Sequence, residues 1–362
     1  MDHVTQPVTD ALQTKCSACG GFMQYSPADE NLKCVYCGKI TDLDKTAAEI
    51  VENDFLYWKD RADENADADV VETSEIKCRQ CGASTTLPPN VSGAKCAFCG
   101  TPLIMNEATV KRFWQPNYLL PFKVSARLGG KNFANWIAGK WFAPSALKKS
   151  AVSHDTLKGV YLPFWTYDAN TFTEYTGERG NDRKERYKND KGETVTRTIT
   201  DWHPARGNVQ VAFDDVLVPA SKTLPKSIAG RLTNWDMKNC VAYRKEFLAG
   251  FVTEIYQHDF RESLDDAKKL MKPVIETAIR RDIGGDHQRI QSTKTRYDDV
   301  KFKHLLLPVW MSAFRYNDKL YQFVVNGRTG QVVGNYPKSA GKIVAVVLGV
   351  FAVIAALWWL MN

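Results

Sequence analysis

The sequence predicts an α+β fold, and three observations lead to this class. A cysteine pattern occurs twice near the N-terminus, a long aromatic middle region combines β-prone runs with one helical pattern, and the last residues are almost all apolar. The composition, 44% apolar and 25% charged over 362 residues, is that of a globular protein with a sizeable core. It excludes a wholly disordered chain, a collagen and a disulfide miniprotein.

Eight of the nine cysteines form two copies of the spacing C-x2-C-x14-C-x2-C, and the second copy follows the first after a shift of 62 positions. They are Cys16, Cys19, Cys34 and Cys37 in the first copy and Cys78, Cys81, Cys96 and Cys99 in the second. Two C-x-x-C turns can bring four thiolates to one tetrahedral ion at about 2.3 Å each, and the glycine after each pair permits the positive φ that closes the turn. The pattern predicts two structural Zn²⁺ ions in two zinc ribbons, ribbon 1 over residues 1–41 and ribbon 2 over residues 76–106. Free or redox-active cysteines are the alternative, but a redox pair does not need four sulfurs at this spacing.

Two aromatic residues inside the cysteine pattern and one cysteine outside it need a separate interpretation. Tyr36 and Phe98 occupy equivalent positions between cysteines, where an aromatic ring either projects from the turn toward a partner or packs against its own hairpin. The ninth cysteine, Cys240, has no nearby partner and is predicted to be a small buried hydrophobe.

Residues 42–75 form an acidic linker between the ribbons. Residues 41–77 hold twelve acids and four bases, a net charge of −8 in a chain of net charge +7, so the remainder carries +15. Apolar residues at helical spacing predict a short amphipathic helix: Leu43, Ala47, Ile50, Val51, Phe55 and Trp58. We expect a solvated spacer; the alternative is an acidic segment that folds back on the basic body or mimics nucleic acid.

The body, residues 107–337, is expected to be a β-rich aromatic α+β unit. Its predicted strands are 160–172, 194–202 and 209–218, followed by a β-meander over 303–314, 320–325 and 331–333. Between them, Phe260 to Ile283 has a helical apolar stripe, which includes Leu270 and Val274, and Pro273 should kink this helix.

Two further patterns of the body concern its edges. Proline recurs in Leu120-Pro121-Phe122, Leu162-Pro163-Phe164-Trp165 and Leu307-Pro308-Val309-Trp310, which predicts a strand start or a sheet edge at each, because proline cannot donate to a ladder. The stretch Gly177 to Glu193 interleaves basic and acidic residues. It is expected to be a polar loop, a solvated hairpin rather than a phosphate-binding patch.

Residues 338–362 are predicted to be a membrane anchor. Ile343 to Met361 contains no charged side chain and would form a helix about 28 Å long, against a hydrocarbon core of roughly 30 Å. A helix buried in a large core is the alternative. Lys338 and Lys342 before the run, and no apolar leader at the start, predict a single-pass, tail-anchored inner-membrane protein with most of the chain in the cytoplasm. A reducing compartment favours thiolate–metal chemistry.

No catalytic motif is recognisable. The six histidines have no metal-ligand spacing, and His203 is expected to be a packed or capping residue. The sequence contains no G-x-S-x-G, H-E-x-x-H or G-x-G-x-x-G in a suitable context and no phosphate-binding loop. We therefore predict no catalytic residue and no enzyme activity.

The paired ribbons, the LPFW and LPVW runs, the stretch Tyr321 to Gly334 and the apolar end resemble a family of bacterial tail-anchored double zinc-ribbon proteins. Members often carry a name borrowed from the primosomal replication helicase, but this sequence lacks a Walker A loop and a D-E-x-H box. The resemblance implies zinc ligation by the eight cysteines and no catalytic residue. It also implies partners among SPFH-domain, TPM-domain or phage-shock-type membrane proteins.

The function expected from the sequence is a non-enzymatic, membrane-anchored zinc-ribbon adaptor that recruits protein partners, with envelope stress as a candidate setting. The alternatives are a membrane-tethered nucleic-acid-binding protein of the replication or transcription type and an enzyme with an unrecognised site in the body. Eight thiolates and two divalent ions lower the formal charge from +7 to about +3. Nucleic acid is therefore not the favoured partner.

Overall fold

The computed structural model describes residues 15–44, 51–61, 70–86, 94–103, 109–150, 157–316 and 319–361. The predicted α+β class is confirmed: the described residues form a large mixed sheet, two small sheets and several helices. The predicted domain limits stay predictions.

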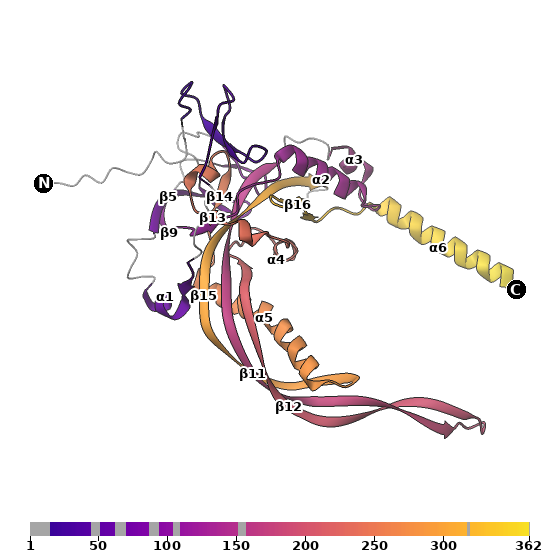
Figure 1. The fold of residues 1–362 in the computed structure, drawn as a ribbon. Helices are drawn as coiled ribbons and strands as arrows, with labels where there is room; N and C mark the ends of the chain where they lie inside the picture. The colour runs from indigo at the N-terminus through magenta and orange to yellow at the C-terminus, as the bar shows by residue number, and fades with distance from the viewer. Residues whose placement is uncertain are drawn as a thin grey trace.

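Three long strands form the centre of the molecule and continue into a projecting arm. The strand β11 (Lys158–Lys188) pairs antiparallel with β12 (Thr194–Pro219) on one side and with β15 (His287–Tyr316) on the other. In Figure 1 these strands curve away from the rest of the fold, and the β11–β12 hairpin continues beyond β15. The predicted strand 160–172 lies within β11, but the predicted strands 194–202 and 209–218 are parts of the single strand β12, and the predicted loop from Gly177 is wrong. Both strands continue through it to a turn at residues 189–193, because backbone pairing with a neighbouring strand needs no apolar pattern.

The helix α5 (Phe260–Ile283) packs along the arm, with the limits that the sequence predicts. Its buried side chains recur every three to four residues: Phe260, Ser263, Leu264, Ala267, Met271, Ile275, Ile279 and Ile283. Leu270 and Val274, which the apolar pattern places in the buried stripe, are instead 52% and 50% exposed. The narrow arm covers only one face of the helix, so these two neighbours remain on the solvent side. The kink at Pro273 stays a prediction.

A row of β-bulges crosses the arm where it leaves the body. The register of β11 shifts between Tyr167 and Ala169 against β12, and between Asp168 and Asn170 against β15. Opposite these positions Asp215 and Asp299 have φ values of 54° and 50°, a left-handed conformation that aspartate tolerates better than most residues. Each is the second aspartate of an Asp-Asp-Val sequence. Bulges bend and twist strands, so this row accounts for the curvature of the arm.

The three prolines of the recurring runs are not at strand starts. Pro163 and Pro308 lie inside β11 and β15, and Pro121 follows the short strand β10 (Tyr118–Leu119). The carbonyl of Pro163 accepts from Ala220 N (3.0 Å) and that of Pro308 from Gly327 N (2.8 Å). Each proline therefore lies where the neighbour on one side of its strand changes. Beside Pro163 the neighbour changes from β14 (Val252–Glu254) to β12, and beside Pro308 from β10 to β16 (Lys319–Asn326). The missing N–H costs no ladder bond there, so a central strand tolerates the proline.

Short elements complete the body around β11 and β15. The strands are β9 (Thr109–Trp114), β13 (Val241–Ala242), β14 (Val252–Glu254), β16 (Lys319–Asn326) and β17 (Val332–Gly334). The helices are α2 (Ala126–Ala138), α3 (Ser145–Ser150), α4 (Lys226–Ala229) and the 3₁₀ turns Met237–Asn239 and Lys245–Leu248. The order β15–β16–β17 is antiparallel, which confirms the predicted meander.

The acidic linker contacts the body in its described parts. The strand β4 (Asn53–Asp54) pairs with β15 and leads into α1 (Phe55–Arg61). The predicted helix from Leu43 is wrong in its limits, since residues 51–54 are not helical; its members Ala47 and Ile50 lie outside the described residues. Phe55 packs edge-on against Phe260 and Phe302, with ring centroids 5.7 and 6.3 Å apart. Here the linker folds back on the body and is not a solvated spacer.

Within the described residues, one helix is long and apolar enough to cross a membrane. It is α6 (Ala340–Met361), whose candidate span Ala340–Leu360 has a mean hydropathy of 2.7 and no buried part. Figure 1 shows α6 extending from the body at the end of the chain. The full exposure argues against the alternative of a helix buried in a core, and single-pass membrane anchoring is the interpretation that the helix supports.

Candidate metal centres

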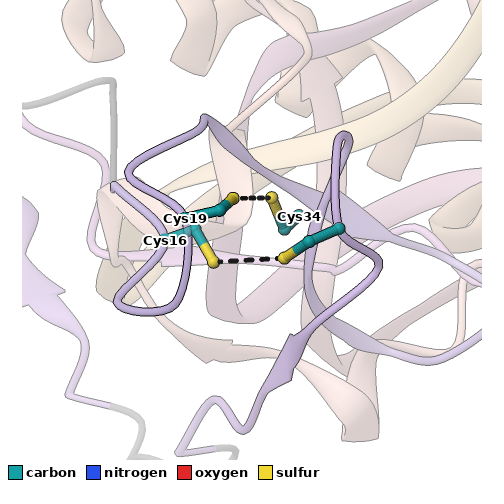
Figure 2. A group of neighbouring side chains, drawn as sticks. Cys16, Cys19 and Cys34 are labelled. Carbon is teal, nitrogen blue, oxygen red and sulfur yellow. Dashed lines mark hydrogen bonds between the residues drawn. The ribbon is translucent and has the colours of Figure 1, made fainter.

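In ribbon 1 the sulfurs of four cysteines converge between two turns. The turns flank the hairpin of β1 (Met23–Ser26) and β2 (Asn31–Cys34), which β3 (Ile40–Thr41) extends to three strands. The Sγ–Sγ distances are 3.5 Å for Cys19–Cys34 and 3.6 Å for Cys16–Cys37. Figure 2 shows Cys16, Cys19 and Cys34 pointing into the same space from opposite turns.

Ribbon 2 repeats this geometry with the equivalent residues. Its Sγ–Sγ distances are 3.5 Å for Cys78–Cys99 and 3.6 Å for Cys81–Cys96. In each set all four sulfurs lie within 4.8 Å of one another. A tetrahedral ion with bonds of about 2.3 Å requires sulfurs about 3.8 Å apart, so both sets fit such an ion. The eight predicted residues thus gather in two groups of four at metal-binding geometry, and their coordination of an ion stays a prediction.

The glycines after the cysteine pairs adopt the conformation that the sequence predicts. Gly20, Gly38, Gly82 and Gly100 have φ between 70° and 76°. The N–H of each donates to the carbonyl oxygen of the first cysteine of its pair, at 2.8 to 3.1 Å. The four turns are therefore one backbone motif that places each pair of sulfurs.

One cysteine in each ribbon has a strongly lowered pKa, and the two occupy equivalent positions. Backbone N–H groups of Cys37 and Tyr36 lower the pKa of Cys34 to about 6. The neighbouring thiol of Cys81, followed by the backbone N–H groups of Phe98 and Cys99, lowers the pKa of Cys96 to about 5. Stabilised thiolates are what a metal ion requires of its ligands.

The two ribbons differ in burial. In ribbon 1 Cys19 and Cys37 are exposed, whereas in ribbon 2 only Cys81 is more than slightly accessible. Tyr36 is 72% exposed and its equivalent Phe98 is fully buried. Neither alternative describes its copy fully, since Tyr36 is exposed but covers Gly21 of its own ribbon, and Phe98 packs into a core shared with the body.

A single residue accompanies this difference. The Tyr36 ring lies over Gly21, so close that a methyl group at this position would collide with the Cδ2 atom of the ring. The equivalent residue in ribbon 2 is Ala83, which has that methyl group and is 1% exposed. An aromatic ring in ribbon 2 cannot take the place of Tyr36, and Phe98 turns into the core instead.

Ribbon 2 is part of the body in its described residues. The strand β6 (Ser84–Thr86) pairs with β5 (Val70–Lys77) and with β14, and β14 in turn pairs with β11 of the body. The strands β7 (Ala94–Lys95) and β8 (Pro102–Leu103) pair with each other. Phe98 shares a core cluster with Leu120, Val160 and Leu307, and its carbonyl accepts from Gln322 Nε2 at 2.9 Å. Ribbon 1 packs on a different cluster and makes its own small sheet.

A buried carboxyl group lies beside ribbon 2. Glu254 on β14 is 1% exposed, and one of its oxygens accepts from Ser221 Oγ at 2.8 Å and from Thr223 Oγ1. The other oxygen, Oε2, has no hydrogen-bond partner among the described residues. Burial raises the pKa of Glu254 to about 8, so the group is largely protonated at neutral pH.

A second polar cluster, which the sequence reasoning missed, lies at the row of bulges. The ammonium of Lys303, 7% exposed as a side chain, lies 2.7 Å from Asp215, 3.1 Å from Glu52 and 3.9 Å from Asp168. Burial, and then the Glu52 carboxylate, raise the pKa of Asp168 to about 7. Glu52, Asp168 and Asp214 lie close enough to hold a metal ion, but Lys303 supplies positive charge at this point. The cluster ties the linker to three strands, and the Asp-Asp-Val sequence at residues 214–216 was the one signal in the sequence that pointed to any part of it.

Several ionisable side chains of the arm pair with one another. The pairs are Arg183 with Asp201 (2.7 Å), Arg197 with Glu185 (2.7 Å), His287 with Asp182 (3.1 Å) and Arg289 with Glu178 (3.4 Å). This agrees with the solvated hairpin predicted from the interleaved charges. His203 is not packed as predicted, since β12 exposes it to solvent.

The remaining isolated groups agree with structural roles. Cys240 is 6% exposed, as predicted, and burial raises its pKa to about 12. His304 is 3% exposed beside the Trp165 ring, and burial lowers its pKa to about 4. A buried neutral imidazole packed against an indole fits a core residue rather than a base.

Comparisons with known proteins give one distant relative. No protein-family model matches the chain, and no solved structure matches it. The chain is 26% identical over 237 residues to the uncharacterized protein YdjG of Bacillus subtilis (strain 168), and this match covers 65% of the chain and 67% of YdjG. The two four-cysteine clusters and the C-terminal apolar helix are consistent with a membrane-anchored zinc-binding protein.

Proposed function

We propose that this protein is a non-enzymatic adaptor, stabilised by two structural zinc ions and anchored in a bacterial inner membrane by α6, whose ribbon 1 recruits protein partners. The observation that carries the proposal is the apolar surface of ribbon 1. Phe22, Val35, Tyr36 and Ile40 are 43%, 51%, 72% and 46% exposed. Val35 N donates to Phe22 O at 3.2 Å, so the residue before β1 and the residue after β2 are adjacent. Exposed apolar patches on soluble modules mark interaction sites.

The zinc assignment rests on the chemistry of the donors. Four cysteine thiolates in a tetrahedral arrangement favour zinc, and four protein ligands leave no open position for a substrate. Each ion would therefore hold its two turns together, and ribbon 1 would present a rigid surface. We assign no catalytic step to either centre.

The orientation and the partners follow from the sequence. Lys338 and Lys342 precede the uncharged run Ile343 to Met361, which favours a cytoplasmic location for the body under the positive-inside rule. The resemblance to tail-anchored double zinc-ribbon proteins points to SPFH-domain, TPM-domain or phage-shock-type proteins as partners, in envelope stress.

The test compares two sets of exposed apolar residues. Phe22, Val35 and Tyr36 of ribbon 1 are changed together to serine, and Leu270 and Val274 of α5 are changed to serine as the control. The full chain, solubilised in neutral detergent, captures proteins from membranes of its own cells, and quantitative mass spectrometry compares the yields. We expect at least a tenfold loss of the SPFH-, TPM- or phage-shock-type partners with the ribbon variant alone, while both variants retain two zinc ions. Equal yields from the ribbon variant and the intact chain would contradict the proposal.

Nucleic-acid binding is the second candidate, because the residues outside 41–77 carry a net charge of +15. Binding of this kind depends steeply on salt, since phosphate contacts release counterions. A DNA or RNA affinity that falls by orders of magnitude between 50 and 200 mM salt would favour this candidate over the adaptor.

A further inference from the structure

A groove of about 520 Å³ lies between the end of α2 and β17. Its lining includes two cationic side chains, Lys140 and Arg231, and two aromatic ones, Trp136 and Tyr336. The ammonium of Lys140 lies 5.0 Å from the centre of the Trp136 ring. No carboxylate of the described residues lines the groove. This combination of positive charge and aromatic surface suits an anion attached to an apolar body.

The segments around the groove are basic in sequence. Residues 108–154 contain eight lysines and arginines and no acid, and residues 319–362 contain four and no acid. The acid nearest in sequence to the lining residue Thr233 is Asp236, and Arg328 Nε already donates to it at 2.8 Å. Basic residues therefore outnumber acidic ones in the segments around the groove, which favours an anion as its ligand.

The groove lies beside the start of the membrane helix. Ser339 N, just before α6, donates to Phe142 O at 2.8 Å. Lys342 Nζ in the first turn of α6 donates to Trp141 O (3.0 Å) and Ala143 O (2.8 Å). The turn that follows α2 is thus tied to the first turn of α6, and Figure 1 shows α2 and α3 next to this end of the helix.

The exposed Trp141 supports a location at the membrane surface. Its indole is 56% exposed, although the side chain is large and apolar. Tryptophan is enriched at the level of the lipid headgroups, where its ring contacts acyl chains and its N–H contacts water. A body held at the first turn of α6 would place Trp141 and the groove at this level.

We propose that this groove binds the phosphate headgroup of an anionic phospholipid from the membrane that α6 enters. Lys140 and Arg231 would contact the phosphate, Arg231 through the planar fork that suits phosphate oxygens. Trp136 and Tyr336 would line the glycerol and the start of the acyl chains. Such a contact would add a second attachment to the membrane beside α6 and would help to fix the angle between the body and the membrane. The inference rests on α6 as a membrane span and is independent of the adaptor role.

The experiment uses the full chain in a neutral maltoside detergent and native mass spectrometry. Phosphatidylglycerol, phosphatidylcholine and inorganic phosphate are added separately, and the lipid retained per chain is counted. We expect one phosphatidylglycerol per chain, retained at least tenfold better than phosphatidylcholine. The variant Lys140→Glu/Arg231→Glu should lose this preference. The control Lys184→Glu/Lys188→Glu, which makes the same charge change on the exposed arm, should keep it.

A milder variant, Lys140→Gln/Arg231→Gln, controls for misfolding of the charge-reversal variant. Its zinc content and thermal midpoint should equal those of the intact chain, while its lipid retention falls about tenfold. The inference is overturned if the two lipids are retained equally, or if both groove variants retain phosphatidylglycerol as the intact chain does. Displacement of the lipid by equimolar inorganic phosphate would also overturn it, since the site would then be one for a soluble anion. Carbonate extraction of membranes tests α6 separately, so failure of the span and failure of the headgroup site are distinguishable.

Discussion

Tyr36 and Phe98 offer a matched pair of substitutions, because they are equivalent residues of one repeated motif in opposite environments. Phe98 is fully buried among body residues, and Tyr36 is 72% exposed on ribbon 1. Replacing each with alanine removes an aromatic ring from the same place in the same kind of turn. The metal ligands on either side are unchanged. We expect Phe98→Ala to destabilise the whole body and Tyr36→Ala to leave its stability almost unchanged.

The magnitudes follow from burial. Truncation of a fully buried phenylalanine to alanine costs about 3 to 5 kcal/mol, because transfer free energy is lost and a cavity remains. Substitution of an exposed side chain changes the free energy of unfolding by about 0.5 kcal/mol or less. For a chain of this size 1 kcal/mol corresponds to roughly 2 °C, so we expect the thermal midpoint to fall by roughly 6 to 10 °C for Phe98→Ala and by roughly 1 °C for Tyr36→Ala.

Thermal unfolding of the full chain in detergent, followed by tryptophan fluorescence, measures both shifts. Elemental analysis of each variant checks that two zinc ions remain, which separates a packing effect from loss of metal. Phe98→Leu serves as the control, since it keeps most of the buried volume and should cost less than about 1.5 kcal/mol. Equal shifts for the two alanine variants at full zinc content would refute the distinction between an embedded and a displayed ribbon.

The remaining predictions concern charge, metal release and anchoring. Burial raises the pKa of Glu254 from 4.5 to about 8 in the folded protein, so the free energy of unfolding of the intact chain declines as pH rises through that window. Between pH 6 and 8 the free energy of unfolding of Glu254→Gln should therefore rise, relative to that of the intact chain, by on the order of 2 to 3 kcal/mol. A difference in thermal unfolding that does not change with pH would contradict this. Lys303→Met leaves Glu52, Asp168 and Asp215 without their shared cation and should cost about 3 to 5 kcal/mol near pH 7, against a negligible cost for Lys184→Met on the arm, in denaturant titrations. A chelator should remove the zinc ion of ribbon 1 quickly and that of ribbon 2 slowly, because the exposed cysteines belong to ribbon 1. Cys19→Ser should abolish only the fast phase, and a single phase for both ions would be inconsistent with this. Removal of residues 340–362 should release the chain from membranes, whereas the intact chain should resist salt and carbonate; extraction of the intact chain by either would count against the span.

Features that depend on local spacing were predictable from the sequence. The two four-cysteine groups, the positive φ of the four glycines, the limits of α5 and the apolar C-terminal helix each follow from residues that are close together in the chain. In such cases the turn or the helix period decides the outcome, and distant parts of the fold alter it little.

Features that depend on distant pairing were not predictable. The polar residues from Gly177 to Lys188 have no strand pattern, yet they form strands because β12 and, at the start, β15 lie beside them. The sequence pattern places Pro163 and Pro308 at strand starts, but their central positions depend on where neighbouring strands change. The cluster around Lys303 unites four segments that are far apart in the sequence. Of these segments, only Asp214-Asp215-Val216 belongs to a repeated sequence.

The contrast between the ribbons shows how one motif can serve two purposes with the same metal geometry. The sulfur distances agree within 0.1 Å between the copies, so the cysteines do not decide which ribbon is buried. The surroundings of the turns decide it. At position 21 glycine leaves space for the Tyr36 ring on the ribbon itself, whereas Ala83 closes that space and Phe98 enters the core of the body. Ribbon 2 thereby becomes part of the core of the body, and ribbon 1 keeps Tyr36 and its other exposed apolar side chains on the surface.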